Sequence, residues 1–163
     1  MTKIQDNKEV TENHKKSKSK VSRFSVFIIS EKLFGIELSS VNEVITLPKI
    51  SQIPSAPKHI LGVFSLRGKI LTLLEINEIL GIRSQEYDEE NMVLIADHFN
   101  QKAGILVEKV LDVINIDESE IQLPSRDMSH KMAKNIIGYY ENESMGTINL
   151  LNLNELLAPH NIS

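Results

Sequence analysis

The sequence predicts a mainly β protein built from two copies of one unit. Short runs rich in β-branched and aromatic residues alternate with turn residues after about residue 22. Residues 73–80 (LLEINEIL) also read almost identically to residues 150–157 (LLNLNELL). Further matches occur in the same order upstream, so we infer an internal duplication. They pair residues 35–38 with 104–107, 41–45 with 110–114, 53–54 with 123–124, and 61–63 with 137–139.

The predicted strands follow these β-branched runs in order along the chain. They are residues 24–29, 33–38, 63–66, 70–74, 92–96, 103–108, 110–116, 137–140 and 147–151. Strands 63–66 and 70–74 form a hairpin around Arg67 and Gly68, where glycine accepts any positive φ that the turn requires. Many short strands with regular turns are typical of small barrels or a sandwich.

Short helices are predicted between the strands. Residues 40–43 (SVNE) have the spacing of a capping box, which predicts a helix beginning there. Residues 55–62 carry a proline near their start and a glycine at their end, which predicts one helical turn. Residues 76–80 and 152–157 are predicted to be helical, the first ending at Gly81.

Length favours one folded domain made of two dependent halves. The chain has 163 residues, and a unit of about 70 residues buries too little surface to be stable alone. We therefore predict subdomains at about 23–90 and 91–157 that share a core, joined by the polar junction 83–91. Residues 1–22, polar and rich in lysine, are predicted to be a disordered tail. Residues 158–163 are predicted to be a short C-terminal tail.

Composition argues against several classes of function. The chain has no cysteine, which excludes disulfides and thiolate metal sites. No two of its five histidines lie three or four residues apart, so no metal or cofactor site is predicted. Phosphate-binding and nucleophile motifs are absent, so no enzyme is predicted. A net charge of −4 gives no electrostatic reason to expect nucleic acid. Without a membrane-length apolar run or a signal peptide, we expect a cytoplasmic protein.

Arg67 is the charged residue with the best-defined candidate role. It lies at the tip of an apolar hairpin, and a guanidinium offers five donors suited to a carboxylate or to carbonyl groups. From spacing alone, a solvated turn arginine explains it equally well. A purely structural Arg67 would pair with a buried carboxylate such as Glu75.

Residues 53–68 (IPSAPKHILGVFSLRG) resemble the signature of CheW-like chemotaxis coupling domains. In that family a proline-containing segment precedes a Gly-Val strand and an Asn-Leu-Arg-Gly turn. Residues 24–27 (FSVF), 34–38 (FGIEL) and 41–44 (VNEV) resemble the family's opening strands and helix. The resemblance covers about residues 23–157, and it depends on the order of these pieces together.

The resemblance implies two SH3-like five-stranded β-barrels packed around a shared core. It implies a non-enzymatic adapter, without cofactors, that couples chemoreceptor tips to the histidine kinase CheA. Such a protein would be located at receptor arrays beneath the inner membrane without inserting into it. One barrel would pair with the CheW-like regulatory domain of the kinase, and receptor hairpins would dock near the junction of the barrels.

The resemblance also implies a set of protein-interaction residues. Arg67 and Gly68 match the family's Arg-Gly turn. Val41, Glu43 and Val44 match a short helix that borders the receptor groove in the family. Val41 and Val44 lie three residues apart, so they equally fit the buried stripe of such a helix.

The chain departs from the family pattern at several positions. Ser65 stands where the family commonly has Asn, and residues 72–77 (TLLEIN) lack a common Pro and Arg. Any contact made by that family Arg is therefore in doubt. Two alternative functions remain: a paralogue in another chemosensory-type pathway, and a tandem SH3-like ligand-binding module, because SH3-like barrels carry many functions.

Overall fold

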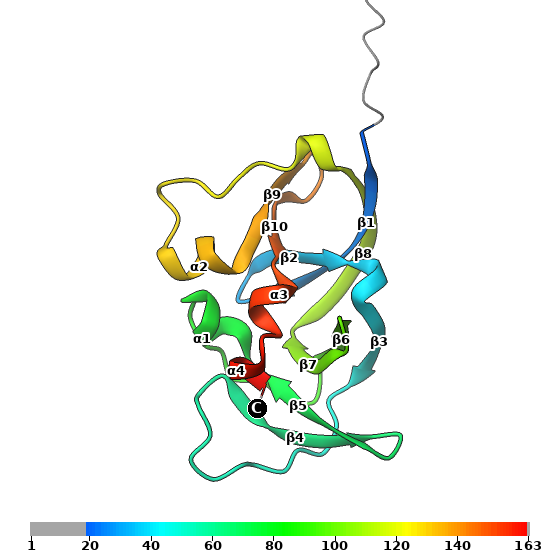
Figure 1. Ribbon diagram of the computed structural model, residues 1–163, viewed down its shortest axis with the longest axis vertical. Helices are drawn as coiled ribbons and strands as arrows, with labels where there is room; N and C mark the ends of the chain where they lie inside the picture. Colours follow the sequence, from blue (N-terminus) through cyan, green and yellow to red (C-terminus); the bar gives the residue numbers. More distant parts are fainter. Residues whose placement is uncertain (1–18, 163) are drawn as a thin grey trace, which may run out of the picture.

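Two five-stranded sheets form the framework of the protein. The computed structural model describes residues 19–162. Sheet A has the strand order β8-β1-β2-β10-β9 and sheet B has the order β3-β6-β7-β5-β4. In Figure 1 sheet A lies above sheet B, with short helices between and beside them. The strands are β1 (Val21–Ile29), β2 (Lys32–Glu37), β3 (Val41–Thr46), β4 (Ile60–Leu66), β5 (Lys69–Leu74), β6 (Met92–His98), β7 (Gln101–Val107), β8 (Lys109–Asp117), β9 (Ile136–Asn142) and β10 (Gly146–Leu151).

The prediction of a mainly β fold with two five-stranded units is confirmed. The helices are all short: η1 (Leu38–Ser40), α1 (Ile76–Leu80), η2 (Glu118–Glu120), α2 (His130–Asn135), α3 (Leu153–Leu156) and α4 (Pro159–Ile162). Helix α1 ends as predicted at Gly81, which adopts the left-handed conformation with φ 67°.

Each sheet combines strands from both halves of the sequence repeat. Sheet A joins β1 and β2 of the first half to β8, β9 and β10 of the second, while sheet B joins β3, β4 and β5 to β6 and β7. The two halves are joined by two parallel pairs, β2 beside β10 and β5 beside β7, and by two antiparallel pairs, β1 beside β8 and β3 beside β6. The junction at 83–91 therefore connects strands of the same sheet, sheet B, and does not separate the two sheets. The chain crosses between the sheets at η1 and returns through the single residue Glu108.

Three apolar clusters fill this arrangement. The largest lies between the sheets and contains Phe27 and Phe34 of sheet A together with Ile105 of sheet B. A second cluster, around Phe64, comes from the strands of sheet B. A third, around Phe24, comes from the strands of sheet A. The shared core that the size of each half predicted is thus the largest cluster, and it joins the two sheets.

The named strands form open sheets, consistent with the expected SH3-like fold, and in each sheet one short bridge links the segment that follows one edge strand to the opposite edge strand. In sheet B, Ser51 and Val63 exchange backbone hydrogen bonds of 2.8 and 2.9 Å. In sheet A, Gln122 and Tyr139 do the same at the equivalent position of the repeat. Each bridge requires close approach to a glycine next to it. A Cβ added to Gly138 would lie 2.3 Å from the Gln122 carbonyl oxygen.

Three hairpins turn through two residues that both have positive φ, the geometry of a type I′ turn. They are Ser30-Glu31 between β1 and β2, Arg67-Gly68 between β4 and β5, and Phe99-Asn100 between β6 and β7. Arg67 has φ 48°, a conformation that costs a non-glycine residue about 1 kcal/mol or more. The turn at 67–68 was predicted, but the positive φ of Arg67 was not.

Two predicted helices are absent. Residues 41–46 form β3 and pair with β6, so the helix predicted from residue 40 was wrong. The β-branched residues of that run fit a strand, and the Glu43 side chain binds elsewhere instead of capping. Residues 55–62 form turns that lead into β4 at Ile60, without a helix.

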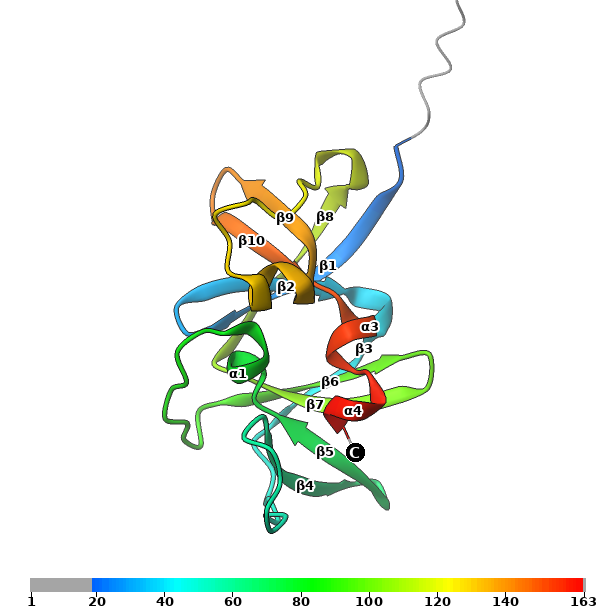
Figure 2. The same cartoon turned by 60° about the vertical axis from the view of Figure 1, so that its left-hand side comes forward.

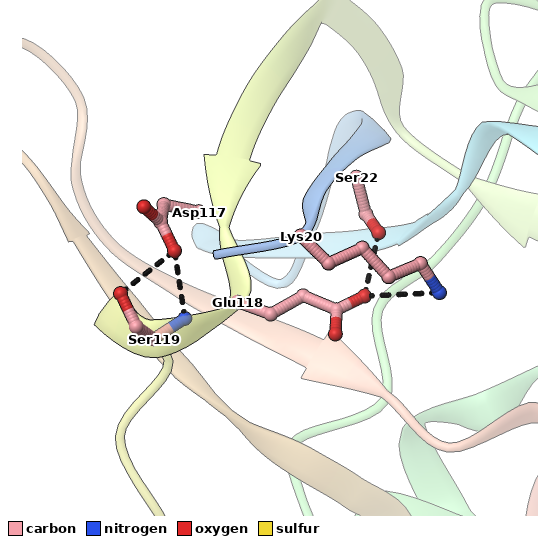
Figure 3. Close-up of polar contacts among 5 residues, drawn as sticks. All are labelled: Lys20, Ser22, Asp117, Glu118 and Ser119. Atoms are coloured by element: carbon pink, nitrogen blue, oxygen red, sulfur yellow. Dashed lines mark hydrogen bonds and ion pairs between the residues drawn. The ribbon is translucent and has the colours of Figure 1, made fainter. Parts of the chain in front are cut away.

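The inner end of the predicted N-terminal tail and the described part of the predicted C-terminal tail both belong to the fold. Residues 1–18 lie outside the described residues, but Val21 and Ser22 already belong to β1. Figure 3 shows Ser22 and Lys20 both bonded to Glu118, at 2.7 and 3.4 Å. At the other end, α4 packs onto the protein: the Thr72 hydroxyl donates to the Ile162 carbonyl at 2.9 Å.

The exchanged strands predict that the two halves depend on each other. Residues 1–86 and 87–163, expressed separately, should each lack a cooperative thermal transition, because each loses the parallel partner of its hairpin. Mixing the fragments should restore a cooperative transition, measured by circular dichroism. A cooperative transition of either fragment alone, at the midpoint of the whole chain, would contradict this dependence.

The edge bridge predicts an unequal effect of two glycine substitutions. Gly138→Ala should destabilise the protein by about 1–3 kcal/mol, the usual range for forced overpacking, because the new Cβ meets the Gln122 carbonyl. Gly146→Ala is the matched control: no atom lies within 4 Å of its added Cβ and only its φ of 90° is unfavourable. Denaturant unfolding measures both, and a smaller loss in Gly138→Ala would be inconsistent with the bridge.

The N-terminal contact predicts the behaviour of one carboxyl group. The Ser22 hydroxyl, and then the charge of Lys20, lower the pKa of Glu118 below its ordinary value. This contact stabilises the fold above the unfolded-state pKa, and the stabilisation is lost as the pH falls through the folded pKa. In an NMR titration, Ser22→Ala should raise the pKa of Glu118. Ser119→Ala is the control, since Ser119 binds Asp117; an equal shift of Glu118 in both variants would rule the contact out.

Candidate functional site

The predicted site residues converge on one ion pair in sheet B. Arg67 Nη1 donates to Glu43 Oε1 at 2.6 Å and Nη2 donates to Oε2 at 2.8 Å. Such a two-bonded fork fixes the orientation of both side chains. The Glu43 carboxylate raises the pKa of Arg67, first by the hydrogen bond and then by its charge. The structure thus brings Arg67 and Glu43 together, a pairing that the sequence did not indicate.

The ion pair joins opposite edges of sheet B. Glu43 lies on β3 at one edge, and Arg67 lies in the turn next to β4 at the other edge. The Arg67 side chain is 75% exposed, whereas that of Glu43 is 24% exposed. An exposed pair of this kind contributes little to folding, because solvent screens the two charges. The guanidinium is therefore held in place while most of its surface faces solvent, which suits a contact with another molecule.

The other predicted residues lie around this pair. Gly68 completes the turn, and no atom lies within 4 Å of a Cβ added to it. Val41 and Val44 are half-buried on β3 and pack against the between-sheet core. Their partial burial fits the buried interpretation of these two valines, and the interface interpretation stays a prediction.

The sequence repeat identifies a second apolar strand that was not among the predicted site residues. Val110 on β8 is the counterpart of Val41 and packs against the same core. Its neighbours Leu111 and Val113 are 38% and 37% exposed. We call the set Val41, Val44, Val110, Leu111 and Val113 the β3–β8 surface. The matches 41–45 with 110–114 were the signal that could have found it.

The two halves differ at the ion pair. Asp112 is the counterpart of Glu43, but its carboxylate accepts from the backbone N–H of Val113 at 2.7 Å. The turn between β9 and β10 offers no arginine, because its residues 143–145 are Glu, Ser and Met. The duplication therefore repeats the strand but not the charged fork, so the two ends of the molecule have different chemistry.

The departures from the family pattern have local explanations. Arg67 pairs with Glu43 and not with Glu75, whose carboxylate accepts from the Ser84 hydroxyl. Asn77, at the position of the missing Arg, is buried and donates to Ser30 Oγ at 2.7 Å and to the Arg83 carbonyl at 2.8 Å. Asn77 thus ties α1 to the β1–β2 turn, a structural role.

Other kinds of site find no support in the described part of the chain. Between residues 19 and 162, no group of three or more His, Asp or Glu side chains is placed to hold a metal ion. Among the helices of the same residues, none has the length and apolar character to cross a membrane.

Comparison with known proteins identifies the family. A family model described as the CheW-like domain matches residues 23–159. The chain belongs to the CheW-like domain family. The resemblance found in residues 53–68 and in the opening strands is therefore confirmed. The match begins and ends close to the predicted limits of 23 and 157.

Several CheW-like proteins are similar over much of the chain. The chemotaxis protein CheW of Helicobacter pylori is 26% identical over 101 residues, 62% of this chain and 61% of that protein. The chemotaxis protein CheV3 of the same organism is 30% identical over 129 residues, 78% of this chain and 42% of that protein. The chain thus spans less than two thirds of either relative. A crystal structure of the scaffolding protein TtCheW from Thermoanaerobacter tengcongensis has a TM-score of 0.77 at 26% identity, covering 88% of this chain and 100% of the other.

Proposed function

We propose that this chain is a non-enzymatic chemotaxis scaffold that couples chemoreceptor tips to the histidine kinase CheA. The observation that carries the proposal is the CheW-like match over residues 23–159. The neighbour of the same fold, TtCheW, is described as a scaffolding protein. A scaffold needs exposed contact surfaces and no reacting groups, and the candidate site consists of apolar side chains and one ion pair.

Receptor tips are proposed to bind the β3–β8 surface beside Arg67. Its apolar side chains include Leu111 and Val113, which are more than a third exposed. Its edge carries the exposed guanidinium of Arg67, which has further N–H donors besides the two that bind Glu43. Apolar centres with arginine at the margin are typical of protein interfaces.

The regulatory domain of the kinase is proposed to bind an end of the molecule away from the β3–β8 surface. Each sheet has an exposed apolar side chain just after its edge bridge, Ile53 at 43% and Leu123 at 80% exposure. Because the two sheets repeat one design, each end has an exposed apolar side chain that a CheW-like partner domain could cover, although only the sheet B end carries the Arg67–Glu43 pair. Simultaneous binding of receptor and kinase, which a coupling protein requires, then uses separate faces.

Binding of the purified chain to two partners from the same genome tests the proposal. The partners are the CheW-like regulatory domain of the kinase and a receptor signalling tip, with heparin retention as the comparison. We expect micromolar or tighter binding to both protein partners. Binding to the kinase of another chemosensory pathway alone would favour the paralogue alternative. Retention on heparin without binding to either protein would favour a ligand-binding module.

Arg67 should matter for assembly more than for folding. Arg67→Ala should change the free energy of unfolding by less than about 1 kcal/mol, as usual for exposed positions. Loss of an interface arginine can cost about 2 kcal/mol, or roughly thirtyfold in affinity for one partner. Calorimetric affinities for both partners, together with a thermal melt, measure the two effects.

Two further variants separate the guanidinium from the ion pair. Lys69→Ala is the matched control, because Lys69 is an exposed cation in the same hairpin without a partner among the described residues. The charge swap Glu43→Arg with Arg67→Glu restores a pair in reverse. Full recovery of affinity in the swap would assign the role to the pair itself. If Arg67→Ala bound both partners with wild-type affinity, Arg67 would be a solvated turn residue without a role in binding.

A further inference from the structure

Phe99, in the turn between β6 and β7, is both exposed and strained. Among residues 19–162 it is the most exposed large apolar side chain, at 83%. Its φ of 48° lies in the left-handed region, where the other non-glycine residues of this range are serine, glutamate, arginine and asparagine. For a bulky side chain such a φ is rare and unfavourable. A backbone outlier of this kind is a reason to look for a function.

Folding alone does not favour phenylalanine at this position. The first central position of a type I′ turn prefers Asn, Asp or Gly, which adopt positive φ with less strain. Burial of an aromatic ring stabilises a fold, but most of the Phe99 ring stays in contact with water. Contact with a partner would remove the ring from water, so binding explains this residue better than folding does.

The ring of Phe99 is oriented by its neighbour His98. The two ring centroids lie 4.5 Å apart and the planes are inclined by 70°, an edge-to-face contact. His98 Nε2 in turn lies 2.9 Å from Asn154 Oδ1 on α3, which orients the imidazole. A side chain that is already oriented loses less conformational entropy when a partner binds it.

Phe99 also continues the β3–β8 surface along β6. Val41 lies opposite Ala96 of β6, and His98 Nδ1 is 3.5 Å from the hydroxyl of Ser40, the residue before Val41. Because a strand advances about 3.3 Å per residue, Phe99 lies roughly 10 Å beyond the pair of Ala96 and Val41. Figure 2 shows the β6–β7 hairpin extending past α3 and α4. One partner can therefore contact this turn and β3 together.

The surroundings of Phe99 indicate the chemistry of that partner. Residues 98–101 (HFNQ) carry no carboxylate, ammonium or guanidinium group. The next residues of the hairpin, Asp97 and Lys102, lie directly opposite each other and have opposite charges. A membrane surface or a nucleic acid would require an excess of cations beside the ring. An uncharged aromatic protrusion instead fits an apolar cleft on a protein, with polar groups at its margin.

We propose that Phe99 is a further contact residue for the receptor tip, and that its ring enters an apolar cleft of that partner. This inference rests on the proposed function, because it extends the surface proposed for receptor tips. The kinase is proposed to bind beyond the edge bridges, near Ile53 or Leu123, so its affinity does not depend on Phe99. The residue then serves binding at a cost in stability.

One substitution separates binding from folding. Phe99→Asn should relieve the strained backbone and raise the melting midpoint by about 2–4 °C, the shift expected for one such residue in a chain of this size. The same change should weaken the affinity for the receptor tip about tenfold or more, as for an aromatic residue at an interface. The affinity for the kinase domain should stay that of the wild type. Calorimetry below both melting midpoints measures the affinities, and circular dichroism measures the melts.

Two further variants serve as controls. Phe99→Tyr keeps an aromatic ring in the turn and should retain most of the affinity for the receptor tip. Leu123→Asn removes an apolar side chain of similar exposure, 80%, from a residue without positive φ that follows the edge bridge of sheet A. It should leave both the receptor-tip affinity and the melting midpoint unchanged.

The outcomes distinguish this inference from the proposed function. Wild-type receptor-tip affinity in Phe99→Asn would overturn the inference and leave the proposed function in place; a lower melting midpoint in the same variant would then assign the ring to packing on His98. An equal loss of affinity in Leu123→Asn would also overturn it, because the loss would reflect apolar surface in general. If the wild-type chain binds no receptor tip, the proposed function fails and the inference fails with it.

Discussion

The fold depends on the exchange of hairpins between the two halves of the duplication. Most antiparallel pairs join neighbours in the sequence, but β2 with β10 and β5 with β7 join strands from different halves in parallel. Parallel neighbours cannot be linked by a tight turn, so these pairs form only after strands from both halves of the repeat have been brought together. The between-sheet core with Phe27, Phe34 and Ile105 then closes over them. Both sheets, and both faces of that core, therefore contain residues from the two halves.

The candidate site follows from the same exchange. Because η1 has only three residues, β3 must begin sheet B immediately after β2 ends in sheet A. This short crossing places Val41 at the margin of the shared core and Glu43 on an open sheet edge. The β4–β5 turn then brings Arg67 to the carboxylate. On the other sheet, the return through Glu108 places Val110 at the same margin, without an arginine to meet Asp112. The duplication thus repeats the fold, but only sheet B carries the Arg67–Glu43 ion pair.

Much of the fold could be predicted from the sequence, and the remainder has physical reasons. The strands follow from β-branched runs, and the internal matches predicted two similar units. β3 was assigned to a helix because Val41 and Val44 lie three apart and residues 40–43 have capping spacing; pairing with β6 decided otherwise. The exchange could not be predicted, since the hairpins of the two halves have the same pattern and either would fit either sheet.

The candidate site was only partly predictable. The family resemblance named Arg67, Glu43 and the two valines, but it placed no bond between them. Glu43 and Arg67 are 24 residues apart and meet only because sheet B curves until its two edges approach each other. The periodicity of apolar residues indicates which side chains of one strand share a face. It does not indicate contacts between residues that are far apart in the sequence. The edge glycines Gly62 and Gly138 could be recognised as a matched pair in the repeat. Their role, which is to allow two backbone segments to approach closely, became clear only from the structure.

The division of the sheets along the chain has a consequence for protein synthesis. Sheet B occupies the uninterrupted residues 41–107, whereas sheet A is made from 21–37 and 109–151. A ribosome that adds about 5–20 residues per second therefore releases β1 and β2 roughly 4–14 s before β8 begins to follow. During that interval the hairpin bearing Phe24, Phe27 and Phe34 has no native neighbour on either edge, and β3–β5 of its own half offer a substitute. The nascent chain must either shield this hairpin or later release it from the wrong partner. This requirement exists only during synthesis and cannot be seen in the folded structure.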